Sequence, residues 1–381
     1  MSNYRYQETQ RYFAQVADDI KDIAEQELCT LGARETSPTY RGIYFSAAPK
    51  VLYTINFYAR LISRVLAPLT SFRCHSDRYL YKKAREIEWQ DFLDPSQTFA
   101  VFATVANSRL RHSKFAALRL KDAVVDSFRA TTGVRPSIDT RQPDVWMNLH
   151  IHNDEATISL DTSGGSLHRR GYRKKSVQAP LVETLAAAII QHAEWDGRRP
   201  LYDPFCGSGT LLCEAYMSAA RMPAGLFRKR VGFQSLPDFD ARLWRQVQED
   251  GQAALRPPHQ GLIFGSDIDP EAVHAARVNI AAFPARPAIT VEQRDAFQIR
   301  RIDDAVIVCN PPYGIRMGKQ ANLGDFYARL GDFLKQRCRG STAFIYCGER
   351  QYLKRIGLKP AWKKPLVNGG LDGRLAKYEL Y

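Results

Sequence analysis

Short apolar segments alternate with helical patterns from about residue 200 onward, and this alternation limits the possible folds more than any other feature of the sequence. Strands are predicted at PLYD, LIFGSD, AITVEQ, AVIVCN and STAFIYC, and helices from 209, from 270 and through 325–338. Because these strands are apolar and separated by helices, they indicate a parallel, doubly wound α/β sheet. The last stretch, AWKKPLVNGGLDGRLAKYELY, instead predicts two strands around an NGG turn.

The first 165 or so residues show a different pattern, in which two α+β stretches follow each other. In the second stretch a helix is predicted over 77–93, and two alternating strands meet at a turn formed by Asn153 and Asp154. A longer helix is predicted over 113–130, with Phe115, Leu118, Val125 and Phe128 on or near its apolar stripe.

These patterns divide the chain into four segments. Two α+β segments are predicted at 1–75 and 76–162, and the strand and helix alternation occupies 181–381. The stretch between them, 163–180, is rich in glycine, serine and positive charge, which is typical of a linker.

Composition narrows the class of protein. The 381 residues, 45% hydrophobic and 25% charged, are typical of a soluble globular chain of two or three domains. No run of about 18 apolar residues occurs, and the first residues lack the layout of a signal peptide, so we expect a cytoplasmic protein without a membrane span. Seven scattered cysteines without a CxxC pair indicate free thiols.

No metal is expected. The histidine pair with ligand-like spacing is His150 and His152, which fall on the face of a predicted strand opposite its apolar face. Contact with solvent or with RNA is therefore favoured over zinc for these two side chains.

The charge balance points to an anionic partner. Lys and Arg number 54 against 40 Asp and Glu, which leaves a net charge of +14 and favours nucleic acid. Basic residues gather in the second α+β segment, in the linker and after the helix that begins at 209. The predicted RNA contacts, mostly to phosphate, are Arg109, Arg111, Lys114, Arg169, Arg170, Arg173, Arg228, Lys229 and Arg230.

A glycine turn, DPFCGSGT, joins the first predicted strand of the alternating part to its helix. Gly207 and Gly209 let the backbone approach a ligand at the carboxyl end of the strand, where doubly wound folds bind nucleotides. No Gly-Lys-Thr or Gly-Lys-Ser follows, so the turn is not a P-loop. A merely tight turn remains the alternative.

Acidic residues follow the next two strands. Asp267 in GSDID is suited to accept hydrogen bonds from ribose hydroxyls, and Ile268 to cover an adenine face. Asp269 precedes a proline and is predicted to cap the next helix. Asp295 in RDA is suited either to an exocyclic adenine amine or to capping the strand end.

The sequence Asn310-Pro311-Pro312-Tyr313 directly follows the apolar strand AVIVC. Both prolines remove an N–H donor and stiffen the turn, so carbonyl oxygens and the Asn310 amide oxygen can face one cleft. Such acceptors suit an exocyclic amine on a planar base, and Tyr313 offers a stacking surface. An amine held in this way has its lone pair toward an electrophile, for which a sulfonium methyl group is the natural partner.

A covalent mechanism is disfavoured. Cys206 lies in the glycine turn and Cys309 precedes Asn310, but pyrimidine methyltransferases that use a thiolate usually carry it after a proline, where Tyr313 stands in this sequence. Both cysteines are better explained as small core residues.

Together, DPFCGSGT, GSDID, RDA and NPPYG resemble the S-adenosylmethionine-dependent class I amino-methyltransferases. LHRRGYR, the helix start APLVETLAAA and the terminal NGGLDGRLAKYEL extend this resemblance. The front part resembles a ferredoxin-like segment followed by a THUMP RNA-binding module. Nearly the whole chain is similar to the guanine-N2 methyltransferase half of bacterial 23S ribosomal RNA enzymes, whose second methyltransferase module has no counterpart in these 381 residues.

The resemblance implies a Rossmann-like, seven-stranded methyltransferase domain and roles for particular residues. Asn310, Pro311, Pro312 and Tyr313 would hold the target base. The residues that would bind the cofactor are Asp203, Gly207, Gly209, Thr210, Asp267, Ile268, Asp295, Ala179, Pro180 and Thr184. A guanine amine inside a duplex would also have to be flipped out.

The function expected is methyl transfer from S-adenosylmethionine to the N2 amine of a guanine in 23S ribosomal RNA, free or in an assembling large subunit. Three alternatives stay open: a tRNA guanine-N2 methyltransferase, an adenine-N6 methyltransferase, and an RNA-binding assembly factor without activity. The target nucleotide and the oligomeric state do not follow from the sequence.

Overall fold

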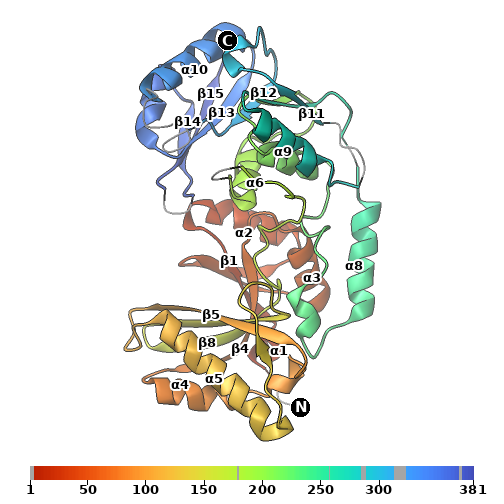
Figure 1. The fold of residues 1–381 in the computed structure, drawn as a ribbon, viewed down its shortest axis with the longest axis vertical. Coiled ribbons are helices and arrows are strands. Elements are labelled where there is room, and N and C mark those ends of the chain that lie inside the picture. Colours follow the sequence, from red (N-terminus) through yellow and green to blue (C-terminus); the bar gives the residue numbers. More distant parts are fainter. Residues whose placement is uncertain (1–3, 178–179, 257, 285–288, 313–322, 369–370) are drawn as a thin grey trace. The chain divides into compact units, whose positions relative to one another are not determined.

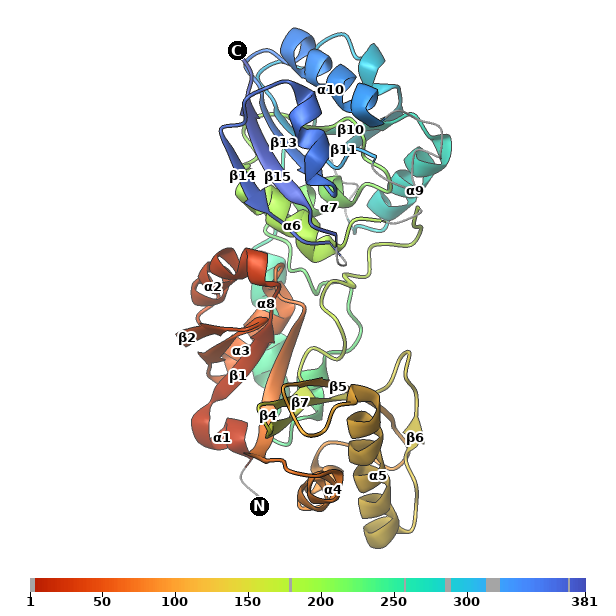
Figure 2. The same ribbon diagram turned by 90° about the vertical axis from the view of Figure 1, so that its left-hand side faces the viewer.

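The computed structural model of the protein describes residues 4–177, 180–256, 258–284, 289–312, 323–368 and 371–381. The chain forms two compact units, each built on one sheet (Figures 1 and 2). The front unit comprises residues 1–167 together with 228–249, and the rear unit comprises 168–227 together with 250–381.

The front unit contains strands and helices in mixed order. Its strands are β1 (Arg11–Gln15), β2 (Arg34–Thr39), β3 (Gly42–Ser46), β4 (Arg64–Arg73), β5 (Thr98–Ala106), β6 (Ser137–Ile138), β7 (Val145–His152) and β8 (Glu155–Asp161). Its α-helices are α1 (Arg5–Thr9), α2 (Lys21–Thr30), α3 (Pro49–Tyr58), α4 (Asp77–Ala84) and α5 (Ser113–Thr132). Short 3-10 helices are η1 (Asp18–Ile20), η2 (Trp89–Asp91) and η3 (Gly232–Ser235). Helix α8 (Ala241–Ala253) begins in this unit.

One eight-stranded sheet runs through both α+β segments, in the order β2-β3-β1-β4-β8-β7-β5-β6. Strand β4 is the junction, because one of its edges pairs with β1 and the other with β8, both antiparallel. The segments predicted at 1–75 and 76–162 therefore share one sheet, although their sequence patterns are separate.

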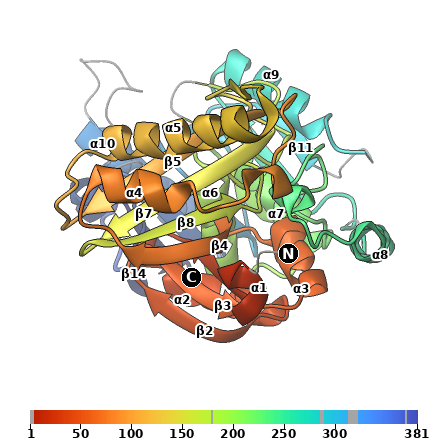
Figure 3. The ribbon, with the colours of Figure 1, turned by 90° about the horizontal axis from the view of Figure 1, so that it is seen from below.

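Helix α5 lies along the strands β5 and β7 (Figure 3). It buries Ala116, Leu120 and Val124, but Phe115 is 47% exposed and Leu118 is 48% exposed. The predicted place of Phe115 and Leu118 on or near the apolar stripe was wrong. The buried face of the helix is instead formed by residues spaced four apart, Ala116, Leu120 and Val124.

The helix predicted over 77–93 ends earlier, at Ala84. The indole N–H of the buried Trp89 donates to the carbonyl oxygen of Ala84 at 2.8 Å, and so satisfies an acceptor at the helix end. The strands and the longer helix predicted nearby match β5, β7, β8 and α5 within a few residues.

Residues 228–249 return from the rear part of the sequence into the front unit. The ring of the fully buried Phe233 stacks on Tyr53 of α3, with 4.4 Å between centroids, and Trp244 packs edge-on against both. Gly232 is required here, because a Cβ atom at this position would lie 1.9 Å from the carbonyl oxygen of Asp161. Phe233 is thus part of the core of the front unit.

The rear unit alternates strands and helices as the sequence predicts. Its strands are β9 (Leu201–Asp203), β10 (Ile263–Asp267), β11 (Ile289–Gln293), β12 (Val306–Cys309), β13 (Thr342–Cys347), β14 (Trp362–Pro365) and β15 (Arg374–Glu379). Its helices are α6 (Glu183–His192), α7 (Thr210–Ala219), α9 (Pro270–Ile280) and α10 (Leu323–Arg337), with 3-10 helices η4 (Ala296–Gln298) and η6 (Arg350–Ile356).

These strands form a seven-stranded sheet in the order β11-β10-β9-β12-β13-β15-β14. The first five in this order are parallel, and β15 runs antiparallel to both β13 and β14. The direction of winding reverses between β9 and β12, and open α/β sheets bind ligands at the carboxyl ends of strands beside such a reversal.

The two terminal strands predicted around the NGG turn are β14 and β15, while the two glycines of that turn lie outside the described residues. Among the helices of the described ranges, none has the length and apolar character that crossing a membrane requires.

Candidate active site

A cavity of about 460 Å³ lies at the carboxyl ends of β9, β10, β11 and β12. Residues lining it are Val177, Pro204, Phe205, Gly207, Asp267, Ile268, Asp269, Ala272, Asp295, Ala296, Phe297, Asn310, Pro312, Phe326 and Arg329. A smaller cavity of about 30 Å³ shares four of these residues and is also lined by Asp203, Pro180 and Thr210. The fold therefore brings the motifs from four separate strands to one place.

The glycine turn is held by its neighbours. Gly207 has φ of +53° and Gly209 has φ of +79°, and both values favour glycine. A Cβ atom on Gly209 would approach Ala276 of α9 to 3.2 Å, and the amide of Cys206 donates to the carbonyl oxygen of Ser266 at 2.9 Å. The turn is thereby fixed against β10 and α9 with its backbone along the cavity.

Asp267 holds two backbone donors with its carboxylate. Its Oδ2 accepts from the Gly207 amide at 2.9 Å, and its Oδ1 accepts from the Asp269 amide at 3.0 Å. Burial raises the pKa of Asp267 above its ordinary value. Each carboxylate oxygen has further lone-pair capacity, so the side chain can also accept from hydroxyl groups in the cavity.

Asp203 is almost completely buried, with 1% of its surface exposed. Its Oδ1 accepts from the Phe205 amide at 3.1 Å. Burial, and then the neighbouring charge of Asp267, raise the pKa of Asp203 well above its ordinary value. A cationic group in the smaller cavity would favour the ionised form of this carboxyl.

Asn310 follows β12, and its Oδ1 is buried at the cavity wall. Among the described residues no donor reaches this oxygen. A buried acceptor without a partner is costly, and its place at the wall of a cavity lets a bound molecule satisfy it. The oxygen is therefore suited to accept from a ligand N–H.

Asp269 caps a helix as predicted, and Asp295 also caps a short helix, close to one of the two alternatives left open for it. Asp269 accepts from the amide of Glu271 at 2.9 Å and caps α9. Asp295 accepts from the amide of Phe297 at 2.9 Å and caps η4, while its side chain also lines the cavity. Ile268 lines the cavity as well and is 67% exposed.

Other predicted site residues have different positions. Pro312 lines the larger cavity, whereas the buried Pro311 and Thr184 of α6 line neither cavity. Ala179 and Tyr313 lie outside the described residues.

Arg170 cannot contact RNA in this structure, and its predicted role was wrong. Its side chain is fully buried and lies 3.3 Å from Glu214 of α7, which also accepts from the hydroxyl of Tyr172 at 3.1 Å. Within the basic run 168–175, Arg170 and Tyr172 are buried, whereas Arg169, Lys174 and Lys175 are exposed.

Arg173 is also directed inward. Its guanidinium pairs with Glu183 at 2.8 Å and donates to the hydroxyls of Ser208 at 3.3 Å and Thr210 at 3.1 Å. A fourth bond goes to the carbonyl oxygen of Leu181 at 2.8 Å. This side chain therefore ties the segment before α6 to the glycine turn, in place of the predicted phosphate contact.

The remaining basic residues differ in exposure. Arg228 of the front unit is half-buried and donates to backbone carbonyls, among them that of Ser166 at 3.3 Å. Arg230 forms an ion pair with Asp144 yet is 77% exposed. The other predicted RNA contacts are exposed side chains: Arg109, Arg111, Lys114, Arg169 and Lys229.

Sequence reasoning missed an aromatic wall. Phe205, Phe297 and Phe326 line the cavity with 5.4–6.2 Å between ring centroids. The guanidinium of Arg329 lies over the Phe297 ring at 4.2 Å. Phe205 lies within the motif DPFCGSGT, and Phe297 is two residues after Asp295 of RDA, so both were next to predicted site residues. Phe326 and Arg329 of α10 belong to no motif that the sequence analysis identified.

The burial of the two thiols beside the site, those of Cys206 and Cys309, disfavours a role as nucleophiles. Cys206 is 5% exposed and Cys309 is fully buried. Burial raises the pKa of each thiol well above its ordinary value, and buried cysteines of this kind are inert. Within the described residues no group of three or more His, Cys, Asp or Glu side chains has the arrangement of a metal site.

The residues present fit an S-adenosylmethionine molecule. The volume of the larger cavity is within the range of small-ligand sites, and the glycine turn presents its backbone there. The Asp267 carboxylate can still accept hydrogen bonds from ribose hydroxyls. A cationic sulfonium or ammonium group would lower the cost of ionising the buried Asp203 carboxyl.

Comparison with known proteins places these features in a family. The model of the RMKL-like methyltransferase domain matches residues 170–377, the THUMP domain model matches 75–161, and the RlmL ferredoxin-like domain model matches 11–66. A crystal structure of a possible methylase from Clostridium difficile 630 has 27% sequence identity and a TM-score of 0.83, covering 97% of this chain and 98% of that one.

Two relatives match along nearly the whole sequence. The Synechocystis sp. protein slr0064 is 42% identical, over 98% of this chain and 97% of its own length. The ribosomal RNA large subunit methyltransferase K/L of Syntrophotalea carbinolica is 38% identical over 97% of this chain, which spans 53% of that relative's length.

The predicted class I methyltransferase fold, the front ferredoxin-like and THUMP regions, and S-adenosylmethionine as the cofactor of the class are confirmed by these matches together with the sheet order. The chain belongs to the family of RMKL-like methyltransferases.

Proposed function

We propose that this protein transfers a methyl group from S-adenosylmethionine to the exocyclic N2 amine of a guanine in 23S ribosomal RNA. The observation that carries the proposal is the buried Oδ1 of Asn310 at the wall of the cavity, which has no hydrogen-bond partner among the described residues. Ribosomal RNA as the substrate is supported by the names of the K/L relatives, about half of whose length this chain spans.

The target base is held through its own hydrogens. Asn310 Oδ1 accepts one amine hydrogen, and Pro311 and Pro312 leave the adjoining backbone with carbonyl acceptors and no N–H donors. Tyr313 stacks on the base in this proposal. Acceptors on the amine hydrogens set the direction of the nitrogen lone pair, so these residues orient the amine for in-line attack.

Asp267 binds the ribose hydroxyls, Asp295 the adenine amine, and Asp203, Gly207, Gly209 and Thr210 surround the methionine end. When bound, S-adenosylmethionine supplies a methyl group on a positively charged sulfur. Asn310 has no titratable proton, so its role is to orient the amine, whose nitrogen loses a proton to water once it carries the methyl group.

The exposed cations provide the grip on RNA. Arg109, Arg111, Lys114, Arg169, Lys229 and Arg230 contact phosphates, which fix position without reading sequence.

Nucleoside analysis tests the substrate. The full chain is incubated with S-adenosylmethionine carrying an isotopic methyl label and with transcribed 23S ribosomal RNA or bulk tRNA. Labelled N2-methylguanosine in the 23S sample is the expected product. Labelled N6-methyladenosine, or N2-methylguanosine in tRNA alone, would replace the proposed target. No transfer together with no calorimetric binding of S-adenosylhomocysteine would favour an inactive RNA-binding factor.

A further inference from the structure

The eight-stranded sheet of the front unit carries a further cavity, of about 330 Å³. The strand registers place its lining residues on one face. Phe13 lies opposite both Tyr44 and Leu66, and Ser159 lies opposite both Pro68 and Asn148. Side chains that oppose each other across neighbouring strands share a face.

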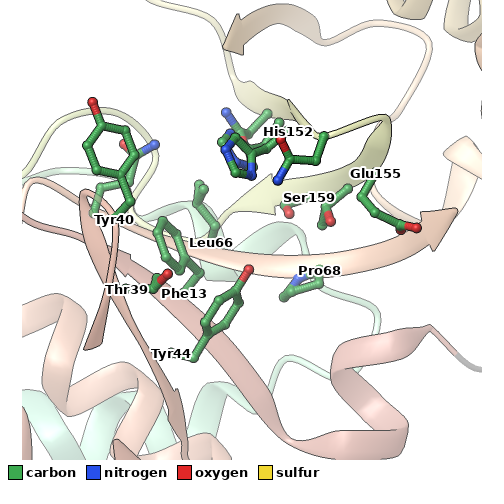
Figure 4. Close-up of a pocket in the computed structure, with 14 residues that line it drawn as sticks. Phe13, Thr39, Tyr40, Tyr44, Leu66, Pro68, His152, Glu155 and Ser159 are labelled. Atoms are coloured by element: carbon green, nitrogen blue, oxygen red, sulfur yellow. The ribbon is translucent and has the colours of Figure 1, made fainter. Parts of the chain in front are cut away.

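The hollow has a local cause. The pairing of β4 with β8 shifts register between Pro68 and Thr70, which marks a bulge or irregularity in β4. A bulge bends its strand and increases the local twist, and proline inside a strand is found mainly at such places. Leu66, Pro68 and Ser159 therefore line a concavity (Figure 4).

One side of the cavity is aromatic. The rings of Phe13 and Tyr44 lie 4.9 Å apart at 56°, and Tyr40 stands near them in Figure 4. Tyr40 is 65% exposed and Tyr44 is 37% exposed. Exposed aromatic rings beside a polar hollow are the platforms on which unpaired bases stack in RNA-binding sheets.

The other side is polar and comes from β7 and β8, with His152, Glu155 and Ser159 visible across the cavity in Figure 4. His150 Nδ1 lies 2.8 Å from the hydroxyl of Thr104. Burial, and then the charge of His152, lower the pKa of His150, so its ring is neutral near pH 7. With Nδ1 beside Thr104, the Nε2 of a neutral His150 can donate to or accept from a base edge, and the Asn148 amide, whose Nδ2 lies 3.5 Å from the carbonyl oxygen of Phe102, keeps its oxygen as an acceptor.

Positive charge borders the aromatic side. The guanidinium of Arg11 lies 5.6 Å from the centre of the Tyr44 ring, and that of Arg41 lies 5.2 Å from the centre of the Tyr40 ring. Such stacked guanidinium groups keep their donors available for phosphate. Glu155 also lines the cavity, opposite Arg73 in the register of β4 with β8.

We propose that this cavity binds an unpaired nucleotide of the RNA substrate, with the base against Phe13 and Tyr44, its edge toward Asn148 and His150, and its phosphate beside Arg11. The proposal rests on RNA being the substrate, as proposed above. An apolar peptide side chain in the same place would leave the polar wall without partners, which is unfavourable.

Binding of a short RNA tests the cavity in the full chain. The probe is a fluorescein-labelled, unstructured 12-nucleotide oligoribonucleotide, and fluorescence anisotropy gives its dissociation constant. Tyr44→Ala and Phe13→Ala are each expected to weaken binding about 5-fold to about 100-fold, because stacking contributes about 1–3 kcal/mol per base. Tyr44→Phe keeps the ring and is expected to restore affinity to within about twofold.

Phe115→Ala is the matched control, since Phe115 is a similarly exposed aromatic residue of the same unit on α5. It is expected to leave affinity unchanged. Equal weakening by Phe115→Ala, unchanged affinity in Tyr44→Ala and Phe13→Ala, or no binding by the unaltered chain would each overturn the proposal.

Calorimetric binding of S-adenosylhomocysteine and the melting temperature verify that every variant is folded. Methylation of 23S ribosomal RNA, measured in parallel, separates the two proposals. Methylation by the unaltered chain with equal oligoribonucleotide affinity in all variants would remove the cavity proposal alone. Selective loss of affinity in the ring variants, with no methylation by the unaltered chain, would remove the proposed function alone.

Discussion

The amide of Gly207 donates to the carboxylate of Asp267 at 2.9 Å, and this bond joins the glycine turn after β9 to the end of β10. Two motifs separated by 60 residues in the sequence thus form one wall of the cavity. The same carboxylate both supports the turn and faces the proposed ribose position, so its removal should affect cofactor binding before it affects RNA.

Asp267→Ala is expected to weaken S-adenosylhomocysteine binding about 10-fold to about 100-fold, because hydrogen bonds to charged groups contribute about 1.5–3 kcal/mol each. Isothermal titration calorimetry measures the change. Asp269→Asn is the matched control, since asparagine also caps helices and this residue is 2 positions from Asp267. Comparable losses in both variants would contradict the specific role of Asp267.

Asn310→Ala is expected to lower the rate of methyl transfer at least about 100-fold while cofactor affinity stays within a few-fold. The Oδ1 atom has no partner among the described residues, so its removal breaks no hydrogen bond within that part of the chain and the melting temperature should change little. Single-turnover kinetics, calorimetry and thermal unfolding provide the three measurements. A large loss of cofactor affinity would show that Asn310 serves the cofactor instead of the base.

Arg173→Ala is expected to lower the melting temperature by about 5 °C or more and to weaken cofactor binding. It leaves Glu183, which is 5% exposed, without its cation, and breaking a buried pair costs about 3 kcal/mol or more. Differential scanning calorimetry measures the first effect and titration calorimetry the second.

Arg169→Ala is the counterpart in the same basic run, because Arg169 is exposed. It should leave the melting temperature unchanged and weaken RNA binding, with the slope of log affinity against log salt reduced by about 1. Interchanged results for Arg169 and Arg173 would contradict the positions of both side chains.

Cofactor binding should depend on pH through Asp203. Its pKa is raised in the folded chain, so the carboxyl keeps its proton above the ordinary value of 3.8. A cationic ligand favours the ionised form, and binding should therefore release a proton and become tighter as pH rises from about 4 toward the raised pKa. The same shift makes the free energy of unfolding fall as pH rises through this window, because the native state holds the proton more tightly.

Calorimetry of S-adenosylmethionine binding in two buffers with different ionisation enthalpies counts the protons released. Asp203→Asn should reduce this release and flatten the pH dependence, and should raise the melting temperature at neutral pH. Proton uptake on binding, or an unchanged profile in Asp203→Asn, would rule out this role.

Much of the rear unit could be predicted from local sequence. The strands β9, β10, β12 and β13 are short apolar runs bounded by turns, and their period and composition indicate buried parallel strands. The capping role of Asp269 followed from the residue type that stands before the helix start, whereas for Asp295 capping was one of two open alternatives. The cofactor roles of individual residues stay predictions until binding is measured.

The wrong predictions of RNA contacts for Arg170 and Arg173 have a common cause. Arg170 and Arg173 stand in a basic run that looks solvated, yet buried partners on other elements, Glu214 and Glu183, receive them. Charge counted along a chain does not reveal which side chains turn inward, because burial depends on partners that are distant in sequence.

The sequence by itself determined the alternation of strands and helices, the glycine turn, the acids at the strand ends and the NPPY segment, since these depend on local period, backbone freedom and residue chemistry. Only the tertiary structure decided that β4 joins two α+β segments into one sheet, that residues 228–249 pack in the front unit, and that Phe326 and Arg329 complete the cavity. Those outcomes depend on packing between distant segments, which the order of residues does not display.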